Sequence, residues 1–175
     1  MRNKLILSAL LLSALAAQSN WTAAMAHVVI GNPQAKAGST FIAAFRVSHG
    51  CAGSPTNTIT VTVPESIITA RPQPKAGWTL STTHAKLAAP VAGEGGPITE
   101  RVSSITWSGG PLPADQYEEF VVMLRLPDAA GVLNFPVLQS CVKGAENWAE
   151  LPDGSGKRPA HPAAALTVTA KDATP

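Results

Sequence analysis

Short runs of alternating or β-branched residues, separated by turn-forming segments, are the feature that most limits how this chain can fold. Fifteen prolines and fourteen glycines all follow residue 30, and no long stretch between them places apolar residues at helical spacing. The apolar or alternating runs are HVVIG, TFIAAFRVS, NTITVTV, WTLSTT, VSSITWS, YEEFVVMLRL, VLNFPVLQS, NWAEL and LTVTA. Turn-rich segments bound them, such as HGCAGSP, RPQPKAG and GGPLPAD. Eight or nine short strands predict an all-β, antiparallel β-sandwich of the immunoglobulin or cupredoxin kind.

Two of these runs predict which side chains form the core. Successive side chains of a strand point to opposite faces, so alternate residues share a face. The residues expected in the core from these two runs are Phe41, Ala43, Phe45, Val47, Phe120, Val122, Leu124 and Leu126. Glu119 is then expected to point outward or toward a sheet edge.

The first 26 residues have the order of a secretory signal peptide. Arg2 and Lys4 precede an apolar run, residues 5–17, and the small residues Ala24 and Ala26 follow it. Thirteen apolar residues fall short of the roughly 20 that span a bilayer, so we expect cleavage rather than a membrane anchor. Cleavage after Ala26 is the first expectation, and cleavage after Ala24 is its main competitor.

Processing after Ala26 leaves one β-sandwich domain, residues 27–170, and a flexible end, residues 171–175. We expect it in the periplasm or another extracytoplasmic compartment, with no membrane span. Removal of the signal peptide takes two of the 13 basic and none of the 11 acidic residues, which leaves eleven of each. This balance gives no electrostatic reason to expect binding to nucleic acid.

The chain has two cysteines, Cys51 and Cys141. An even count in an exported protein favours a disulfide over two free thiols or a thiolate metal site. In the chain-entropy model, closing a loop of this length stabilises the fold by about 4 to 5 kcal/mol, less any strain in the native state. The bridge would bring the segment after Val47 near the segment before Trp148.

A histidine at the first position of the processed chain has a chemical use. The free amine and the imidazole Nδ1 of His27 can chelate one metal ion in a six-membered ring, and both are neutral donors at modest proton cost. Two nitrogen donors suit Cu(II), which has the highest affinity in the divalent series. The alternative is a histidine that occupies this position by chance and binds no metal.

The mature chain resembles the YcnI-like copper-binding family of bacterial exported proteins over roughly residues 27–170. The resemblance rests on AHVVIGNPQAKAGST, FRVSHGCAGSPTNTITVTVPESI, PKAGWTLST, ITWSGGPLPADQYEEFVVMLRLP and SCVKGAENWAELP, in that order. It implies an immunoglobulin-like domain that binds one Cu(II) per chain through a histidine brace, with a tryptophan and a carboxylate nearby. His27 takes the brace position and Trp148 matches the tryptophan, which would otherwise be an ordinary core aromatic.

No single acidic residue aligns with the family's carboxylate. Glu150, two residues from Trp148 on the same predicted strand face, is the first candidate, and Glu119 is a weaker one. His49 is a second candidate, either as a copper ligand or as a side chain that hydrogen-bonds a ligand, because a disulfide at Cys51 would hold it near the first strand and Trp148. The alternative is a histidine that only forms a hydrogen bond within its own turn. Trp78 and Trp107 are expected in the core, and His84 and His161 are expected to be exposed bystanders.

The favoured function is therefore copper binding in trafficking, storage or delivery, with copper and a copper carrier or receiving protein as partners and no catalytic step. A copper enzyme of the polysaccharide monooxygenase type is an alternative, but it needs a second imidazole and a sugar-stacking face, and Tyr117 is the chain's only tyrosine. CopC-like carriers add a late Asp-x-His pair that is missing here. A metal-free immunoglobulin-like interaction module is the remaining alternative.

Overall fold

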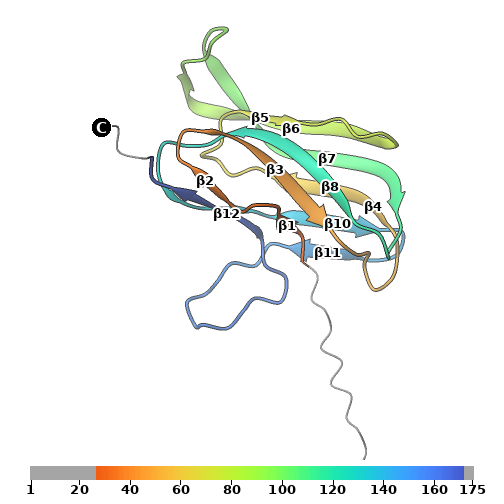
Figure 1. Ribbon diagram of the computed structural model, residues 1–175. Coiled ribbons are helices and arrows are strands. Elements are labelled where there is room, and N and C mark those ends of the chain that lie inside the picture. The colour runs from red at the N-terminus through yellow and green to blue at the C-terminus, as the bar shows by residue number, and fades with distance from the viewer. Residues whose placement is uncertain (1–26, 172–175) are drawn as a thin grey trace, which may run out of the picture.

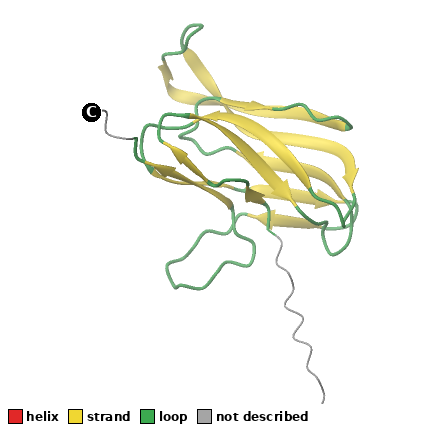
Figure 2. Cartoon of the chain, in the orientation of Figure 1, coloured by secondary structure: helices red, strands yellow, loops and turns green. Residues whose placement is uncertain are grey.

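The computed structural model describes residues 27–171, and the regular elements within that range are all β-strands (Figure 2). The predicted signal peptide and residues 172–175 lie outside the described residues. No helix in the described range is long and apolar enough to cross a membrane.

The strands form three sheets that build a β-sandwich (Figure 1). One sheet contains, in spatial order, β1 (Val29–Ile30), β3 (Thr40–Val47), β8 (Glu118–Arg125) and β5 (Ala70–Pro72). The facing five-stranded sheet contains β11 (Ala145–Trp148), β10 (Val137–Cys141), β4 (Thr56–Thr62), β7 (Ile98–Leu112) and β6 (Trp78–Val91). The small third sheet contains β2 (Gln34–Lys36), β12 (Ala164–Thr169) and β9 (Gly131–Phe135).

The core lies between the sheets, as the alternation of inward and outward residues along the strands predicts. Every residue predicted to face inward is buried except Phe41, which is partly buried and packs against the core. Phe120 of β8 packs on Trp107 of β7, with ring centroids 5.4 Å apart, and Phe45 of β3 packs on Phe135 of β9 at 5.4 Å. Trp107 is fully buried and Trp78 packs against the same cluster, as expected.

The described range holds twelve strands rather than eight or nine. Strands of two or three residues, such as β1, β2 and β5, are too short to show an alternating pattern. The run VLNFPVLQS is two strands, because Pro136 has no N–H to donate to a ladder. The pairing is antiparallel except between β12 and β2, which run parallel.

The hairpin of β6 and β7 is longer than predicted, with strands of 14 and 15 residues. Its outer half is mostly exposed, so its sequence lacks the alternation that a half-buried strand shows. In Figure 1 the end of this hairpin rises away from the sandwich beside β5. It therefore forms a wall beyond the edge of the first sheet.

Candidate functional site

Trp148, the last residue of β11, is the centre of a buried polar and aromatic cluster. It pairs with Val137 on β10 and is only 4% exposed. Its indole Nε1–H donates a hydrogen bond to Oε1 of Gln139, at 3.0 Å. Three imidazole rings surround this indole, those of His27, His49 and His161.

Gln139 holds the cluster together from the middle of β10. Its side-chain amide is 1% exposed, and its Nε2 donates to the backbone oxygen of His49 at 2.7 Å and to Oγ1 of Thr56 at 2.8 Å. An indole N–H can only donate and a peptide oxygen can only accept, so the orientation of this amide is fixed by its partners. The sequence interpretation missed Gln139. A usable signal was present, since it is in phase with the buried residues Val137 and Cys141.

His27 lies two residues before β1, and its side chain is buried. Its ring stands perpendicular to the indole of Trp148, with centroids 5.7 Å apart. Within residues 27–171, the Nε2 of His27 is the one buried side-chain nitrogen or oxygen without a hydrogen-bond partner. Buried polar atoms in native proteins are nearly always paired, so an unpaired one calls for a ligand, an ion or a water.

His49 lies two residues after β3 and approaches Trp148 from another side, with ring centroids 6.2 Å apart. Its Nδ1 lies 2.6 Å from the backbone oxygen of Gly50. Because that oxygen is an acceptor, Nδ1 carries the proton, and in the neutral ring the lone pair is on Nε2. The predicted disulfide between Cys51 and Cys141 is present, and it fixes the turn that carries His49 beside the end of β10.

His161 is not the exposed bystander that the sequence predicts. Its ring lies 5.2 Å from that of Trp148, and its Nε2 lies 3.2 Å from Oε2 of Glu146. This contact is not apparent in the sequence because twelve residues, mostly in an exposed loop, separate His161 from Trp148. His84 is exposed, as expected.

Glu150 lies just beyond β11 and is bound to the segment of His161 rather than continuing the strand face of Trp148. Its backbone forms an isolated parallel bridge with Pro162, and its Oε2 accepts a hydrogen bond from the backbone N–H of His161 at 3.0 Å. That hydrogen bond is the main cause that lowers the pKa of the Glu150 carboxyl below its ordinary value. The side chain is about half exposed. The predicted carboxylate ligand thus has His161 as its neighbour.

Glu119, the weaker carboxylate candidate, points outward as expected. Its Oε1 accepts a hydrogen bond from Nε of Arg46 at 2.6 Å across the β3–β8 ladder. This hydrogen bond does not involve Trp148 or the histidines around it.

The cluster offers nitrogen donors around an indole rather than a closed metal cage. Across the described residues, no three His, Cys, Asp or Glu side chains come together as a ready-made metal site. A chelate made by one residue does not need such a group, because the amine and the imidazole of a terminal histidine supply two donors by themselves.

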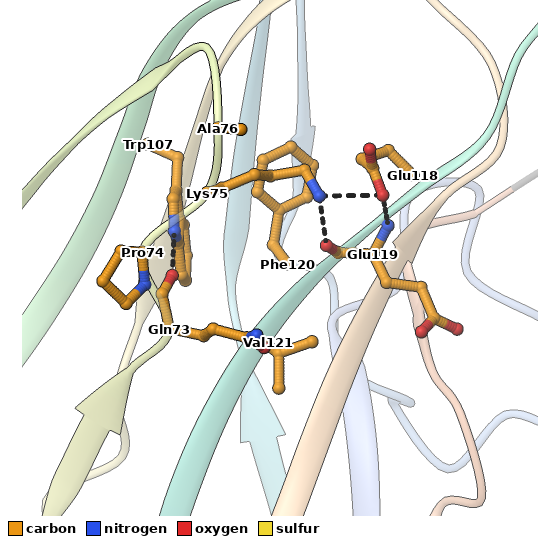
Figure 3. Close-up of a pocket in the computed structure, with 9 residues that line it drawn as sticks. All are labelled: Gln73, Pro74, Lys75, Ala76, Trp107, Glu118, Glu119, Phe120 and Val121. Atoms are coloured by element: carbon orange, nitrogen blue, oxygen red, sulfur yellow. Dashed lines mark hydrogen bonds and ion pairs between the residues drawn. The ribbon is translucent and has the colours of Figure 1, made fainter.

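A separate pocket of about 370 Å³ lies between the β5–β6 connection and β8 (Figure 3). Lys75 fills much of its polar side: its Nζ lies 2.8 Å from Oε1 of Glu118, donates to the backbone oxygen of Glu119 at 3.2 Å, and lies 5.5 Å from the ring centroid of Phe120. Partial burial raises the pKa of the Glu118 carboxyl, but the hydrogen bonds from Lys75 and the backbone N–H of Glu119, together with the Lys75 charge, outweigh it and leave a lowered pKa. The polar groups of this pocket therefore bind one another, and they link the β5–β6 connection to β8.

The fold and the cluster define a class of protein: a small disulfide-bonded β-sandwich domain with histidines gathered around a buried tryptophan. The chain belongs to the family described as "Domain of unknown function (DUF1775)", whose model matches residues 27–168. YcnI-like proteins are part of this family, so the resemblance is confirmed at that level.

A solved structure supports the immunoglobulin-like fold. An uncharacterized protein from Nocardia farcinica, whose crystal structure reveals an immunoglobulin-like fold, is 28% identical to this chain with a TM-score of 0.64. The match covers 83% of this chain and 99% of that one. No curated protein matches the sequence.

Proposed function

We propose that this protein binds one Cu(II) ion outside the cytoplasm through His27, as the first residue of the processed chain, and serves copper trafficking or homeostasis. The observation that carries the proposal is the position of His27, whose ring is buried against the indole of Trp148, the residue that matches the family's tryptophan beside the metal. The chelate would use the amine and Nδ1 of His27 and leave the proton on Nε2, so the unpaired Nε2 calls for a separate hydrogen-bond partner, such as a water, and costs about 1 to 3 kcal/mol without one.

The residues around His27 fit a copper site. His27 would hold the ion through its amine and its imidazole, and the bound Cu(II) would supply a transferable cargo rather than a reaction. His49 donates its Nδ1 proton to the peptide oxygen of Gly50, and a hydrogen bond from one ring nitrogen to a backbone oxygen is common among metal-binding histidines. Trp148 covers the ring of His27 and limits the access of water.

Glu150 is the less favoured of the further ligands. Its carboxylate is engaged by the backbone of His161 and is exposed to solvent, so recruiting it would cost that hydrogen bond. We therefore propose His49 before Glu150 as the next ligand after His27. A copper carrier or receiving protein would exchange the ion at this incompletely enclosed site.

Two measurements test the proposal. Mass spectrometry of the exported protein should locate its first residue at His27. Paramagnetic resonance with one equivalent of Cu(II) should then show a nitrogen-rich site in the chain that begins at His27. Adding one serine before His27 should abolish tight binding, because the chelating amine is displaced.

A matched substitution sharpens the test. His27→Ala should remove the site, whereas His84→Ala removes an exposed imidazole on β6 and should change nothing. Equal Cu(II) affinity of the extended and native chains would contradict the proposed chelate, and absence of tight Cu(II) binding by both chains would favour a metal-free interaction module. Production of hydrogen peroxide and oxidised sugar with ascorbate would favour the enzyme alternative.

A further inference from the structure

A groove of about 1070 Å³ lies beside the end of the β6–β7 hairpin, far from Trp148. One side is formed by β5 and the end of β8, and the other by the hairpin end, residues 92–98. Figure 1 shows this end of the hairpin at the top and β11 at the bottom. The groove lies near Thr40, where β3 begins, whereas His49 follows the end of β3, so the eight residues of β3, roughly 25 Å, separate the two regions.

The floor of the groove is apolar and continues onto an exposed sheet face. Met123 of β8 lines it with its side chain on the outer face, and Ile42 of β3 is paired with Met123 in the antiparallel ladder. Residues 42 and 123 lie on the outer face, opposite the buried Ala43 and Val122, and Ile42 is 55% exposed. An apolar side chain of a partner would find contact here.

Two arginines on the same face border this floor. Arg71 pairs with Met123, and Arg125 lies two residues further along β8, so the two arginines are diagonal neighbours on adjacent strands. Long side chains at such positions are within reach of one another. Both are exposed, and within residues 27–171 neither forms an ion pair. The charge of Arg125 contributes to the lowered pKa of the Asp128 carboxyl, but that carboxylate is bound to Lys171.

The hairpin end supplies a fixed opposite wall. A Cβ atom at Gly93 would lie 2.8 Å from Cγ1 of Ile98 and 2.9 Å from the backbone oxygen of Gly96, so the turn closes tightly only with glycine there. Glu94 is the one acidic residue that lines the groove, against two arginines. The groove thus has a net positive charge and an apolar base.

We propose that this groove binds an acidic peptide segment of a partner protein, with a carboxylate placed between Arg71 and Arg125 and a neighbouring apolar side chain on Met123. The paired guanidinium groups favour a carboxylate because each can donate two parallel hydrogen bonds to it. The proposal does not depend on copper binding, because the groove and the Trp148 cluster share no residue.

The test uses the mature chain labelled with ¹⁵N and a capped peptide of alternating leucine and glutamate. The backbone signals of the β5 and β8 segments should shift on titration, and a matched peptide with glutamine in place of glutamate should bind at least about tenfold more weakly. Arg71→Gln and Arg125→Gln should each weaken binding about tenfold, the change expected for one lost hydrogen bond to a charged group.

Arg46→Gln is the control, because Arg46 is on the same sheet face but is already paired with Glu119 outside the groove. It should leave the peptide affinity unchanged. The proposal is overturned if the glutamine peptide binds equally well, if the control weakens binding as much as the groove variants, or if vesicles of anionic lipid shift these signals while the peptide does not. The same titration with the His27→Ala variant should give the same affinity, which separates this test from that of copper binding.

Discussion

Two buried polar side chains beside Trp148 differ in how their hydrogen bonds are satisfied. Gln139 uses its amide oxygen and its amide nitrogen, and so fixes Trp148, Thr56 and the turn of His49. His27 is also buried, yet its Nε2 has no partner. Gln139 therefore has a structural role that needs no ligand, whereas the unpaired Nε2 of His27 calls for a bound partner.

The role of Gln139 can be tested by replacing it with methionine, which has a similar size but no amide. Gln139→Met leaves the indole N–H and the backbone oxygen of His49 without their partner. Each buried group left unpaired costs about 1 to 3 kcal/mol, so the free energy of unfolding should fall by at least about 2 kcal/mol. Urea unfolding followed by tryptophan fluorescence measures this change.

Gln34→Met is the matched control, because Gln34 is an exposed glutamine on β2. Surface substitutions of this kind usually change stability by less than about 0.5 kcal/mol. A loss in Gln139→Met no larger than in the control would show that the amide network does not stabilise the native state.

At the scale of secondary structure, the sequence predicts elements wherever one face of a strand is buried. The inward residues of β3 and β8 follow from a period of two, because each strand has one buried and one outward face. The outer half of the β6–β7 hairpin has no such asymmetry and could not be predicted. The place of His161 depends on how an exposed ten-residue loop, residues 151–160, returns to Trp148, and no local pattern encodes that path.

The ion pair of Lys75 and Glu118 links the β5–β6 connection to β8 and has a pH dependence. The pKa of Glu118 in the folded state lies below its ordinary value of 4.5, so folding favours the ionised carboxylate. This contribution is complete above the unfolded pKa and is lost as the pH falls through the folded pKa. It is small, at most about 1 kcal/mol, because the Glu118 side chain is 39% exposed and screened by solvent.

Glu118→Gln should therefore lower the free energy of unfolding slightly at pH 7, and the difference from the unmodified protein should decrease as the pH falls below 4.5 and vanish below the lowered pKa of Glu118. Urea unfolding at pH 7, 5 and 3 measures it. Glu65→Gln, at an exposed position away from this pocket, is the control and should show little difference at pH 7. A difference for Glu118→Gln that persists at pH 3 would assign the effect to something other than its charge.

At the scale of the whole molecule, the disulfide joins the two parts of the chain that carry the cluster. Cys51 and Cys141 are 90 residues apart in sequence. His49 lies two residues before Cys51, and Gln139 lies two residues before Cys141. The even number of cysteines predicts the disulfide. The hydrogen bonds of the Gln139 amide to Trp148 and to the backbone of His49 depend on the register of β10 with β4 and β11, which the sequence does not show.

The bridge should therefore affect both stability and copper binding, and by different amounts. In the double variant Cys51→Ala with Cys141→Ala, the free energy of unfolding should fall by about 2 to 5 kcal/mol, since the unfolded chain regains the freedom of a long loop. Copper affinity should fall less than in His27→Ala, because both donors of the proposed chelate belong to His27, whereas His49, the proposed further ligand, would lose only its fixed position. Urea unfolding measures the loss of stability, and Cu(II) titration of tryptophan fluorescence, under conditions where the variant is folded, measures the loss of copper affinity.

Reduced but otherwise unmodified protein is the control, because alanine also removes the buried sulfur atoms. If reduced protein and the double variant lose the same stability, the effect belongs to the covalent link and not to packing. A double variant that binds Cu(II) as weakly as His27→Ala would contradict a chelate centred on His27, because it would show that the ligands on the His49 side dominate. Undiminished copper affinity would instead confine the role of His49 to holding its own turn.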